Sequence, residues 1–489
     1  MPGISTTDRE MCGPAGAGGS GGCGRMDEHE DGPAVVSGRP RQRNRLRWAM
    51  KEFLLPPLLI VGGGVVLAAV AVTIDRASAS WLVALRDAVA VIVPPAASST
   101  MLQTVTPGML TAISIVFFVM LMAVQQQAGT YTTAVLDQFM QRRLNHIFFG
   151  LFIGLAVYYV AVLTVVAPGQ AVVSAAIASV LTMVALVLLL VFIYNTFDQL
   201  RPSSSASVIV HNALRARRTQ QALLARCRST PQLTGTATTR AAVVHSGYIV
   251  DIDIDVLAAA VAKTTGPVEV EFRVALGAHI VTGDTVADVR GSHDADRGRL
   301  AAAVLDSVTI GRTRDTSRDA GYSVDQLAAM AWTASSSQQD PEGAAVAIGA
   351  LHSLLASWGS YYEPAAGRFG GPLPVVYSDE VTHQVLDALT AVIVATGQSG
   401  QHQTCCQVLR IFAEMLPRLA PAYQQAAVED IARVISTATA QVLTVRMERA
   451  IGQLRWALNE TGYQHAAGRL EEAESELSRQ VRELVSAEQ

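Results

Sequence analysis

Charge is the property that this sequence lacks most. Only 16% of its 489 residues are charged, whereas about a quarter are charged in a typical soluble protein. Lysine occurs only at Lys51 and Lys263, so almost every base is an arginine, a bias typical of high-GC bacterial genomes. The net charge is −4, and no basic patch is interleaved with aromatic residues. These features argue against a nucleic-acid partner.

Motifs of enzymes and metal sites are also missing from the sequence. We find no Walker loop, nucleophile elbow, metal-hydrolase motif or dinucleotide fingerprint. His245, His279 and His352 lack metal-ligand spacing. The five cysteines are odd in number and repeat no spacing, which argues against a disulfide framework, and the adjacent Cys405 and Cys406 are interpreted as packed thiols. We therefore expect a protein that is not an enzyme, with no catalytic residue, cofactor or metal.

The longest uncharged stretch predicts a membrane hairpin. No Asp, Glu, Lys or Arg lies between Arg143 and Asp198. The stretch breaks once, at residues 167–170, and each half is long enough to cross a bilayer as a helix, which takes about 20 apolar residues. Two earlier apolar segments also qualify. The predicted spans are residues 53–74, 109–126, 147–166 and 171–194.

Arginines beside the predicted spans orient them. Arg-rich segments precede the first span, separate the second from the third and follow the fourth, whereas the two opposite loops hold two Arg and none. Bases beside spans stay on the cytoplasmic side. We therefore predict a multi-pass protein of the bacterial inner (plasma) membrane, with the N-terminus and the C-terminal domain in the cytoplasm. Binding to anionic lipid head groups is an alternative role for the basic run at 39–51.

Composition predicts a fold class and five regions. The fold class is an α-helical membrane protein with four transmembrane helices plus a cytoplasmic α+β region, in which a small β half-barrel-like module precedes a helical domain. The regions are a disordered Gly-rich and basic tail (1–46), the transmembrane domain (47–200), a basic linker (201–240), the β-rich module (241–320) and the helical domain (321–489).

Local patterns place the elements of the cytoplasmic region. Apolar alternation punctuated by glycine predicts strands within 241–290, with a short helix near 255–263. Residues 277–286 resemble the loop-and-strand element of lipoyl and biotinyl half-barrels but lack the acceptor lysine, so a swinging-arm carrier is not expected. Asp340 and Pro341 predict a helix cap and first turn. Further helices are expected near 323–332, 344–358, 379–396, 402–416, 423–442 and 447–484.

Several fragments resemble one family in their order and spacing. They are 116–127 at the end of the second span, 142–158, 246–253, 277–283, and the run from Ile310-Gly311-Arg312-Thr313 to Asp340-Pro341-Glu342. Together they resemble the domain-of-unknown-function 2254 family of predicted bacterial membrane proteins. The sequence departs from that pattern at Thr130–Thr133 and Ser335–Gln339, where the family has Pro-Arg-Leu-type and Ser-Pro-Gly-type segments. The family has no established activity, so the resemblance implies architecture alone.

Two groups of residues are candidate sites. Gln125, Gln126 and Gln127 stand at the inner end of the second span, where amides either bond neighbouring helices or line a pore or vestibule. The second group is a cluster that forms either an ion-paired surface or a cytoplasmic ligand site. Its members are Arg312, Arg314, Asp319 and Asp340.

The spans contain small residues and no internal charge. Gly62–Gly64, Gly150 with Gly154, and Ser174 with Ala178 predict close helix packing rather than gating. The lack of charge argues against a proton-coupled transporter. We expect a homo-oligomeric channel or transport protein in the lipid bilayer, with a cytoplasmic regulatory domain. The alternative is a non-transporting scaffold or sensor whose cytoplasmic domain binds a protein or small ligand.

Overall fold

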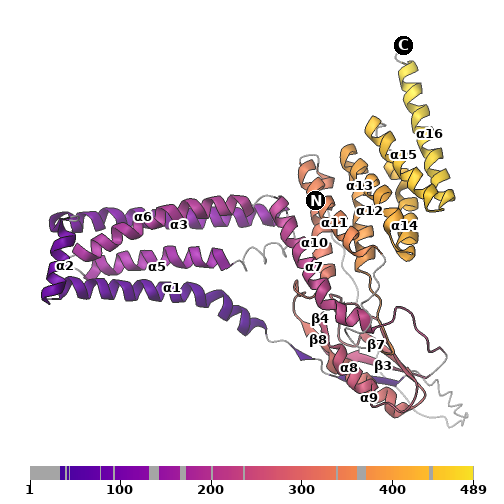
Figure 1. Ribbon diagram of the computed structural model, residues 1–489, viewed down its shortest axis with the longest axis horizontal. Helices are drawn as coiled ribbons and strands as arrows, with labels where there is room; N and C mark the ends of the chain where they lie inside the picture. The colour runs from indigo at the N-terminus through magenta and orange to yellow at the C-terminus, as the bar shows by residue number, and fades with distance from the viewer. Residues whose placement is uncertain are drawn as a thin grey trace, which may run out of the picture.

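Two parts are visible in the computed structural model, a long helical bundle and a mixed region beyond one of its ends (Figure 1). The structure describes residues 34–38, 41–42, 45–77, 79–91, 94–130, 143–165, 172–199, 202–234, 237–337, 340–360, 371–439 and 444–487. The bundle contains α1 (Arg45–Arg76), α3 (Pro95–Thr130), α5 (Arg143–Val165) and α6 (Val172–Gln199). The shorter α2 (Ser80–Ala90) crosses its far end (Figure 1). Part of the predicted outer loop at 75–107 is therefore helical.

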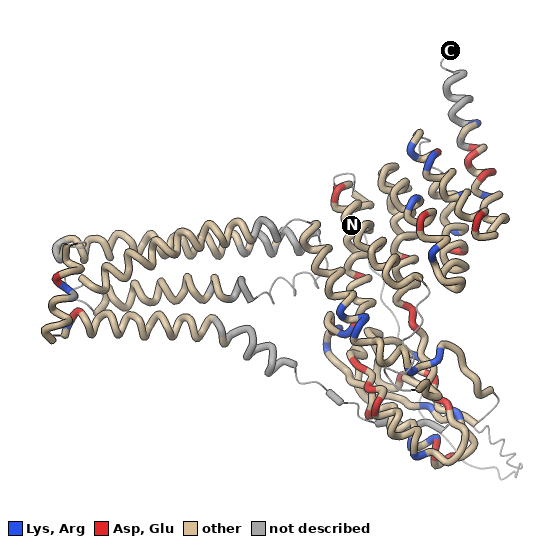
Figure 2. Tube along the Cα trace, in the orientation of Figure 1, with Lys and Arg blue, Asp and Glu red and all other residues tan. Residues whose placement is uncertain are grey.

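Apolar length singles out three of these helices. Pro57–Arg76, Thr100–Val119 and Val172–Asn195 are long and apolar enough to cross a membrane, while the apolar part of α5, Gly150–Val165, is shorter. Figure 2 shows charged residues in the bundle only where α2 joins it, among the residues the structure describes. Three candidate spans are thus shown, and the fourth predicted span is not confirmed.

Glycines bring α1 and α5 close together. A Cβ atom at Gly64 would lie 2.5 Å from the carbonyl oxygen of Gly154, and one at Gly150 would lie 2.7 Å from Cα of Pro57. The prediction of close packing is confirmed for these three glycines. Gly62 and Gly63 have nothing within 4 Å of such an atom, so they do not serve this contact.

Two sheets form the β module. The first sheet has the strand order β1-β3-β7-β5-β9 and the second the order β2-β8-β4-β6. The strands are β1 (Ala34–Gly38), β2 (Arg41–Gln42), β3 (Thr238–Val243), β4 (Gly247–Ile252), β5 (Val268–Phe272), β6 (His279–Ile280), β7 (Thr285–Gly291), β8 (Val308–Gly311) and β9 (Val375–Val376). The helices α8 (Ile254–Val261) and α9 (Asp294–Ser307) share their apolar core. The predicted strands and short helix are confirmed; the half-barrel is not.

The N-terminal strands correct one predicted boundary. Strand β1 pairs in parallel with β3, and β2 pairs in parallel with β8. Both strands, and the start of α1 at Arg45, lie inside the tail predicted to be disordered through residue 46. Composition missed them because an edge strand is held by main-chain hydrogen bonds, which need little apolar sequence.

The predicted basic linker is also wrong. Residues Pro202–Arg226 form the helix α7, which packs against α10 (Ala320–Ser336) and α11 (Pro341–Trp358). Its buried positions recur every third or fourth residue, as expected for one helical face. They are Ala206, Ile209, Ala213, Ala216, Gln220 and Leu223. The arginines lie between these positions, so they obscured the apolar face in the sequence.

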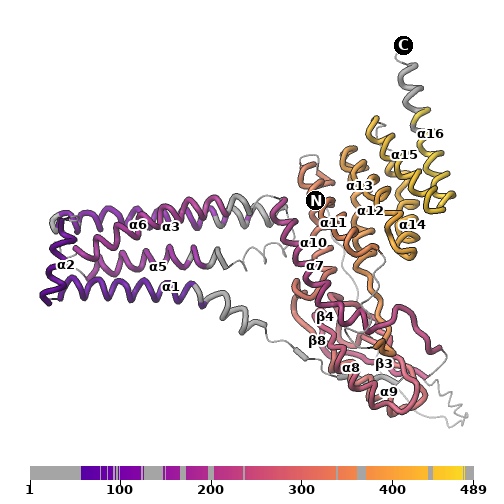
Figure 3. The backbone as a smooth tube through the Cα atoms, in the orientation of Figure 1, coloured from indigo at the N-terminus to yellow at the C-terminus, as the bar shows by residue number. Residues whose placement is uncertain are grey.

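The helical domain is built in two layers that extend away from the bundle (Figure 3). One layer packs α10, α12 (Val381–Ser399), α14 (Pro421–Thr439) and α16 (Gln464–Ala487); the other packs α11, α13 (His402–Met415) and α15 (Val445–Glu460). This stacking of helix pairs is solenoid-like. The single helix predicted at 447–484 is two, because the chain turns at Gly462, where φ is +88°. Residues 375–376 of this region join the first sheet as β9.

Candidate functional site

Helix α3 presents a polar face away from the bundle. It buries Leu102, Thr106, Met109 and Val116 against the other helices. Exposed polar and small residues recur on the opposite face at helical spacing. They are Thr100, Gln103, Thr104, Pro107, Thr111, Ser114 and Gln125, and the apolar Leu110, Phe118, Leu121 and Met122 are exposed among them. The exposed face of α6, by contrast, holds Val180, Met183, Val184, Leu186, Val187, Leu190 and Val191.

The hydroxyls of this α3 face are already bonded within the helix. Thr104 donates to the carbonyl of Thr100 at 2.9 Å, and Ser114 donates to that of Leu110 at 3.0 Å. After Ser114 the face is apolar at Phe118, Leu121 and Met122, which are 64%, 43% and 56% exposed, and Gln125 follows them. Gln125 is exposed, as a pore or vestibule residue requires. The side chains of Gln126 and Gln127 lie outside the described part of the chain.

Asp75 clamps the far end of the bundle. Its side chain is buried, and it accepts hydrogen bonds from the backbone N–H groups of Val173 and Ser174 at 2.9 and 3.0 Å and from the Ser174 hydroxyl at 2.6 Å. These donors begin α6, so the carboxylate lies at the positive end of that helix. Neighbouring Arg76 donates to the carbonyl of Val165, the last residue of α5, at 2.5 Å. Asp75 and Arg76, adjacent in α1, thereby bind the start of α6 and the end of α5, where the hairpin turns.

This clamp gives a stability prediction. Asp75→Ala leaves three donors at the start of α6 unpaired, and hydrogen bonds to a charged group contribute about 1.5–3 kcal/mol each in favourable cases. We expect a loss of about that size in total, because water reaches part of the opened site. The apparent melting temperature of the full chain in detergent measures it. Asp87→Ala, at an exposed position of α2, is the matched control; an equal loss in both would contradict the clamp.

The loop before α10 holds the second candidate cluster. Arg314 donates through Nε to Asp319 Oδ2 at 2.6 Å and pairs with the more exposed Asp325. Asp319, 2% exposed, also caps α10 by accepting from the Tyr322 N–H at 3.0 Å. Arg314 lies 4.9 Å from the centre of the Tyr322 ring. Burial raises the pKa of the Asp319 carboxyl, while the hydrogen bond and charge of Arg314 act to lower it.

This cluster lies where three parts of the protein meet. A Cβ atom at Gly277, in the loop between β5 and β6, would lie 2.2 Å from Asp319 Oδ2, so the β module closes directly over the carboxylate. Gln220 of α7 donates to the carbonyl of Arg318 at 2.8 Å. Helix α7 follows the last bundle helix, so the loop 312–319 connects the bundle, the β module and the helical domain.

The sequence-predicted members of the cluster separate in the structure. Arg314 and Asp319 form the predicted ion pair. Arg312 is exposed and has no ion-pair partner among the described residues. Asp340 caps α11, accepting from the Gly343 N–H at 2.8 Å as predicted. It follows the far end of α10, which at 17 residues is about 25 Å long, so Asp340 is not part of this site.

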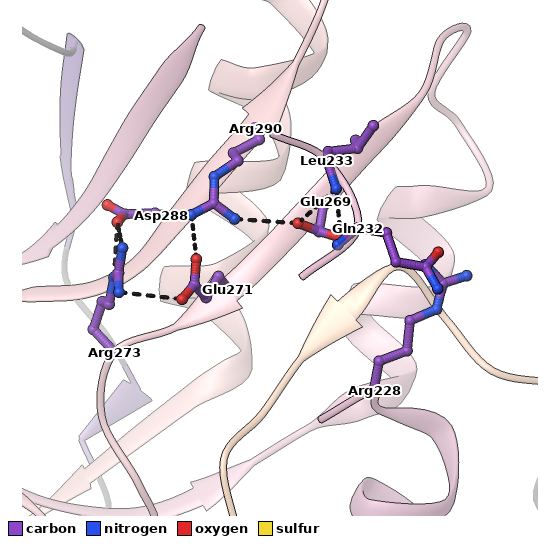
Figure 4. Close-up of polar contacts among 8 residues, drawn as sticks. All are labelled: Arg228, Gln232, Leu233, Glu269, Glu271, Arg273, Asp288 and Arg290. Atoms are coloured by element: carbon purple, nitrogen blue, oxygen red, sulfur yellow. Dashed lines mark hydrogen bonds and ion pairs between the residues drawn. The ribbon is translucent and has the colours of Figure 1, made fainter. Parts of the chain in front are cut away.

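A second charged network covers the outer face of the first sheet (Figure 4). Arg290 bonds Glu269 at 3.1 Å and also pairs with Glu271 across the β5–β7 register. Arg273 bridges Glu271 and Asp288 at 3.1 and 2.8 Å. The Gln232 N–H donates to Glu269 at 2.6 Å. The Leu233 N–H donates to Glu269 as well, at 3.3 Å, so this carboxylate fastens residues 232–233 to the sheet.

These observations define the class of the protein: a helical membrane protein with a β module and a solenoid-like domain. Residues 50–414 match the family described as predicted membrane protein (DUF2254), and the chain belongs to this family. The resemblance seen in the sequence is therefore confirmed. No curated protein and no solved structure matches the chain.

Proposed function

We propose that this protein is a homo-oligomeric channel in which the polar face of α3 from each copy lines the pathway. The observation that supports this is the contrast between the apolar exposed face of α6 and the exposed face of α3 from Thr100 to Ser114, which is largely polar. Apolar side chains suit lipid, whereas polar groups in a membrane favour the bundle interior or a water-filled path. The pathway requires several copies, because α3 turns this face away from its own bundle.

The proposed topology has four spans with both termini in the cytoplasm. Strands β1 and β2 precede α1, and their partners β3 and β8 follow α6. Paired strands lie on one side of the membrane, so the chain between them crosses an even number of times. Three candidate spans leave one crossing to be made, and α5 is the helix that packs between α1 and α6. The Arg-rich flanks support the cytoplasmic side for the paired strands.

Phe118 is the proposed gate. It shares the α3 face with Thr111 and begins the apolar part of that face, which continues at Leu121 and Met122. A ring of such side chains closes a pore by excluding water. Phe117 is similarly exposed, but its side chain points about 100° around the helix. The two neighbours therefore distinguish pore lining from lipid contact.

Single-channel recording in reconstituted bilayers tests the proposal. We expect Phe118→Ser to increase open probability several-fold, because a polar ring stays hydrated, and Phe117→Ser to leave it unchanged. We also expect Thr111→Cys to be blocked by a cationic thiol reagent, with Val184→Cys on α6 and the parent protein as controls. No current from any variant, together with a monomeric mass in mild detergent, would leave the scaffold or sensor alternative.

A further inference from the structure

A cleft opens on the α11–α13–α15 layer of the helical domain. Its volume is about 630 Å³, which lies within the range of about 300–1,000 Å³ common for binding pockets. Each of the three helices contributes polar side chains to it. They are His352 from α11, Gln407, Arg410 and Glu414 from α13, and Gln453 and Trp456 from α15.

The charge available in the cleft is positive. Arg410 is exposed and has no ion-pair partner among the residues that the structure describes. Glu414 is engaged by Arg418 at 3.2 Å. Arg446 and Arg449 are exposed on the neighbouring α15 and likewise lack an ion-pair partner in the described part of the chain. An occupant that carries carboxylates would complement this side of the cleft.

Helix α15 also contributes an aromatic side chain to the cleft, Trp456. Trp456 is 64% exposed, more than Trp332, the exposed tryptophan of α10, at 42%. Tryptophan and arginine are the residues most enriched at binding hot spots. The exposed amide of Gln453 stands one helical turn before Trp456, where it could bond a backbone N–H or C=O.

The aromatic side chain of the cleft comes from outside the family region. The family match ends at residue 414, so α13 lies within it, whereas α15 with Gln453 and Trp456 lies beyond it. Solenoid-like stacks of helices bind extended segments along such surfaces. A cleft built by packing α15 against α13 gives the helical domain a surface that the matched region lacks.

We propose that this cleft binds an extended acidic segment of a protein partner, with carboxylates on Arg410 and an apolar side chain on Trp456. The proposal does not depend on ion conduction. It predicts that the cytoplasmic domain receives a partner at the layer that includes α11, which packs on α7 and so lies close to the route into the membrane bundle.

Fluorescence anisotropy tests the proposal with the full chain in lipid nanodiscs. The probes are labelled twelve-residue peptides that repeat Glu-Leu-Gly or Lys-Leu-Gly, with empty nanodiscs as blank. We expect the acidic peptide to bind at least tenfold more tightly than the basic one. Arg410→Glu and Trp456→Ala should each weaken it about tenfold, which is about 1.4 kcal/mol. Arg410→Glu should also strengthen binding of the basic peptide.

Two matched variants control for net charge and aromatic loss. Arg469→Glu makes the same charge change on α16, in the other layer, at an exposed arginine without an ion-pair partner among the described residues, and Trp332→Ala removes an exposed tryptophan of α10. Both should leave peptide affinity unchanged, and an unaltered melting temperature shows that each variant folds. Equal binding of the two peptides, or equal losses of affinity in the control variants, would overturn the proposal. So would displacement of the acidic peptide by ATP alone if Trp456→Ala had no effect on peptide binding.

Discussion

Gly64→Leu is expected to destabilise the membrane bundle more than any other single change in it. A Cβ atom at position 64 would lie 2.5 Å from the carbonyl oxygen and 3.0 Å from the carbonyl carbon of Gly154. The obstacle is backbone, so no side-chain rotation relieves it, and α1 must move away from α5. Overpacking costs about 1–3 kcal/mol where neighbours adjust, and here we expect a loss of about 3 kcal/mol or more. Size-exclusion chromatography and melting temperature in detergent measure the result.

Gly62→Leu is the matched control for this change. Position 62 lies on the same helix, and nothing lies within 4 Å of a Cβ atom there. Leucine has a higher helix propensity than glycine and faces outward, so we expect unchanged or slightly higher stability. Similar losses at positions 62 and 64 would show that α1 and α5 do not meet through Gly64.

The bundle was predictable because its signals are local. The length of the uncharged apolar stretches predicts the helices, and the spacing of Gly150 and Gly154 predicts the surface through which α5 meets α1. The clamp at Asp75 was not predictable, since its partner Val173 lies 98 residues away. Asp75 and Arg76 looked like balanced loop charges. Two signals could have predicted the contact between Asp75 and Val173. One is a carboxylate at the end of a span, and the other is a run of turn residues before the start of another span.

The features of the β module and the helical domain also divide into local signals, which the sequence predicts, and distant pairings, which it does not. The cap at Asp340 was predicted because capping depends on residues within one turn. The joining of β1 to β3 depends on two segments about 200 residues apart in the sequence, and no local pattern encodes it. Grouping Asp340 with Arg314 and Asp319 was wrong because proximity in the sequence was taken for proximity in space, although a whole helix separates them.

Asp319→Ala is expected to cause the largest loss of stability outside the membrane bundle. It leaves Arg314 without its buried partner and removes the cap of α10. Removing one member of a buried pair costs about 3–5 kcal/mol, and losing a cap contributes about 1 kcal/mol of such a loss. Because Asp319 also faces Gly277 and the loop bound by Gln220, we expect the junction of all three parts to open more often.

Hydrogen exchange of the full chain in detergent, followed by mass spectrometry, measures this opening locally. Peptides that cover α10 should lose protection by roughly a hundredfold or more, since about 1.4 kcal/mol corresponds to tenfold. Asp319→Asn should lose less, because the amide oxygen still caps α10. Asp325→Ala removes the half-exposed partner of the same arginine and should cost under about 1 kcal/mol. If Asp325→Ala exposes α10 as much as Asp319→Ala does, the buried pair does not hold the junction closed.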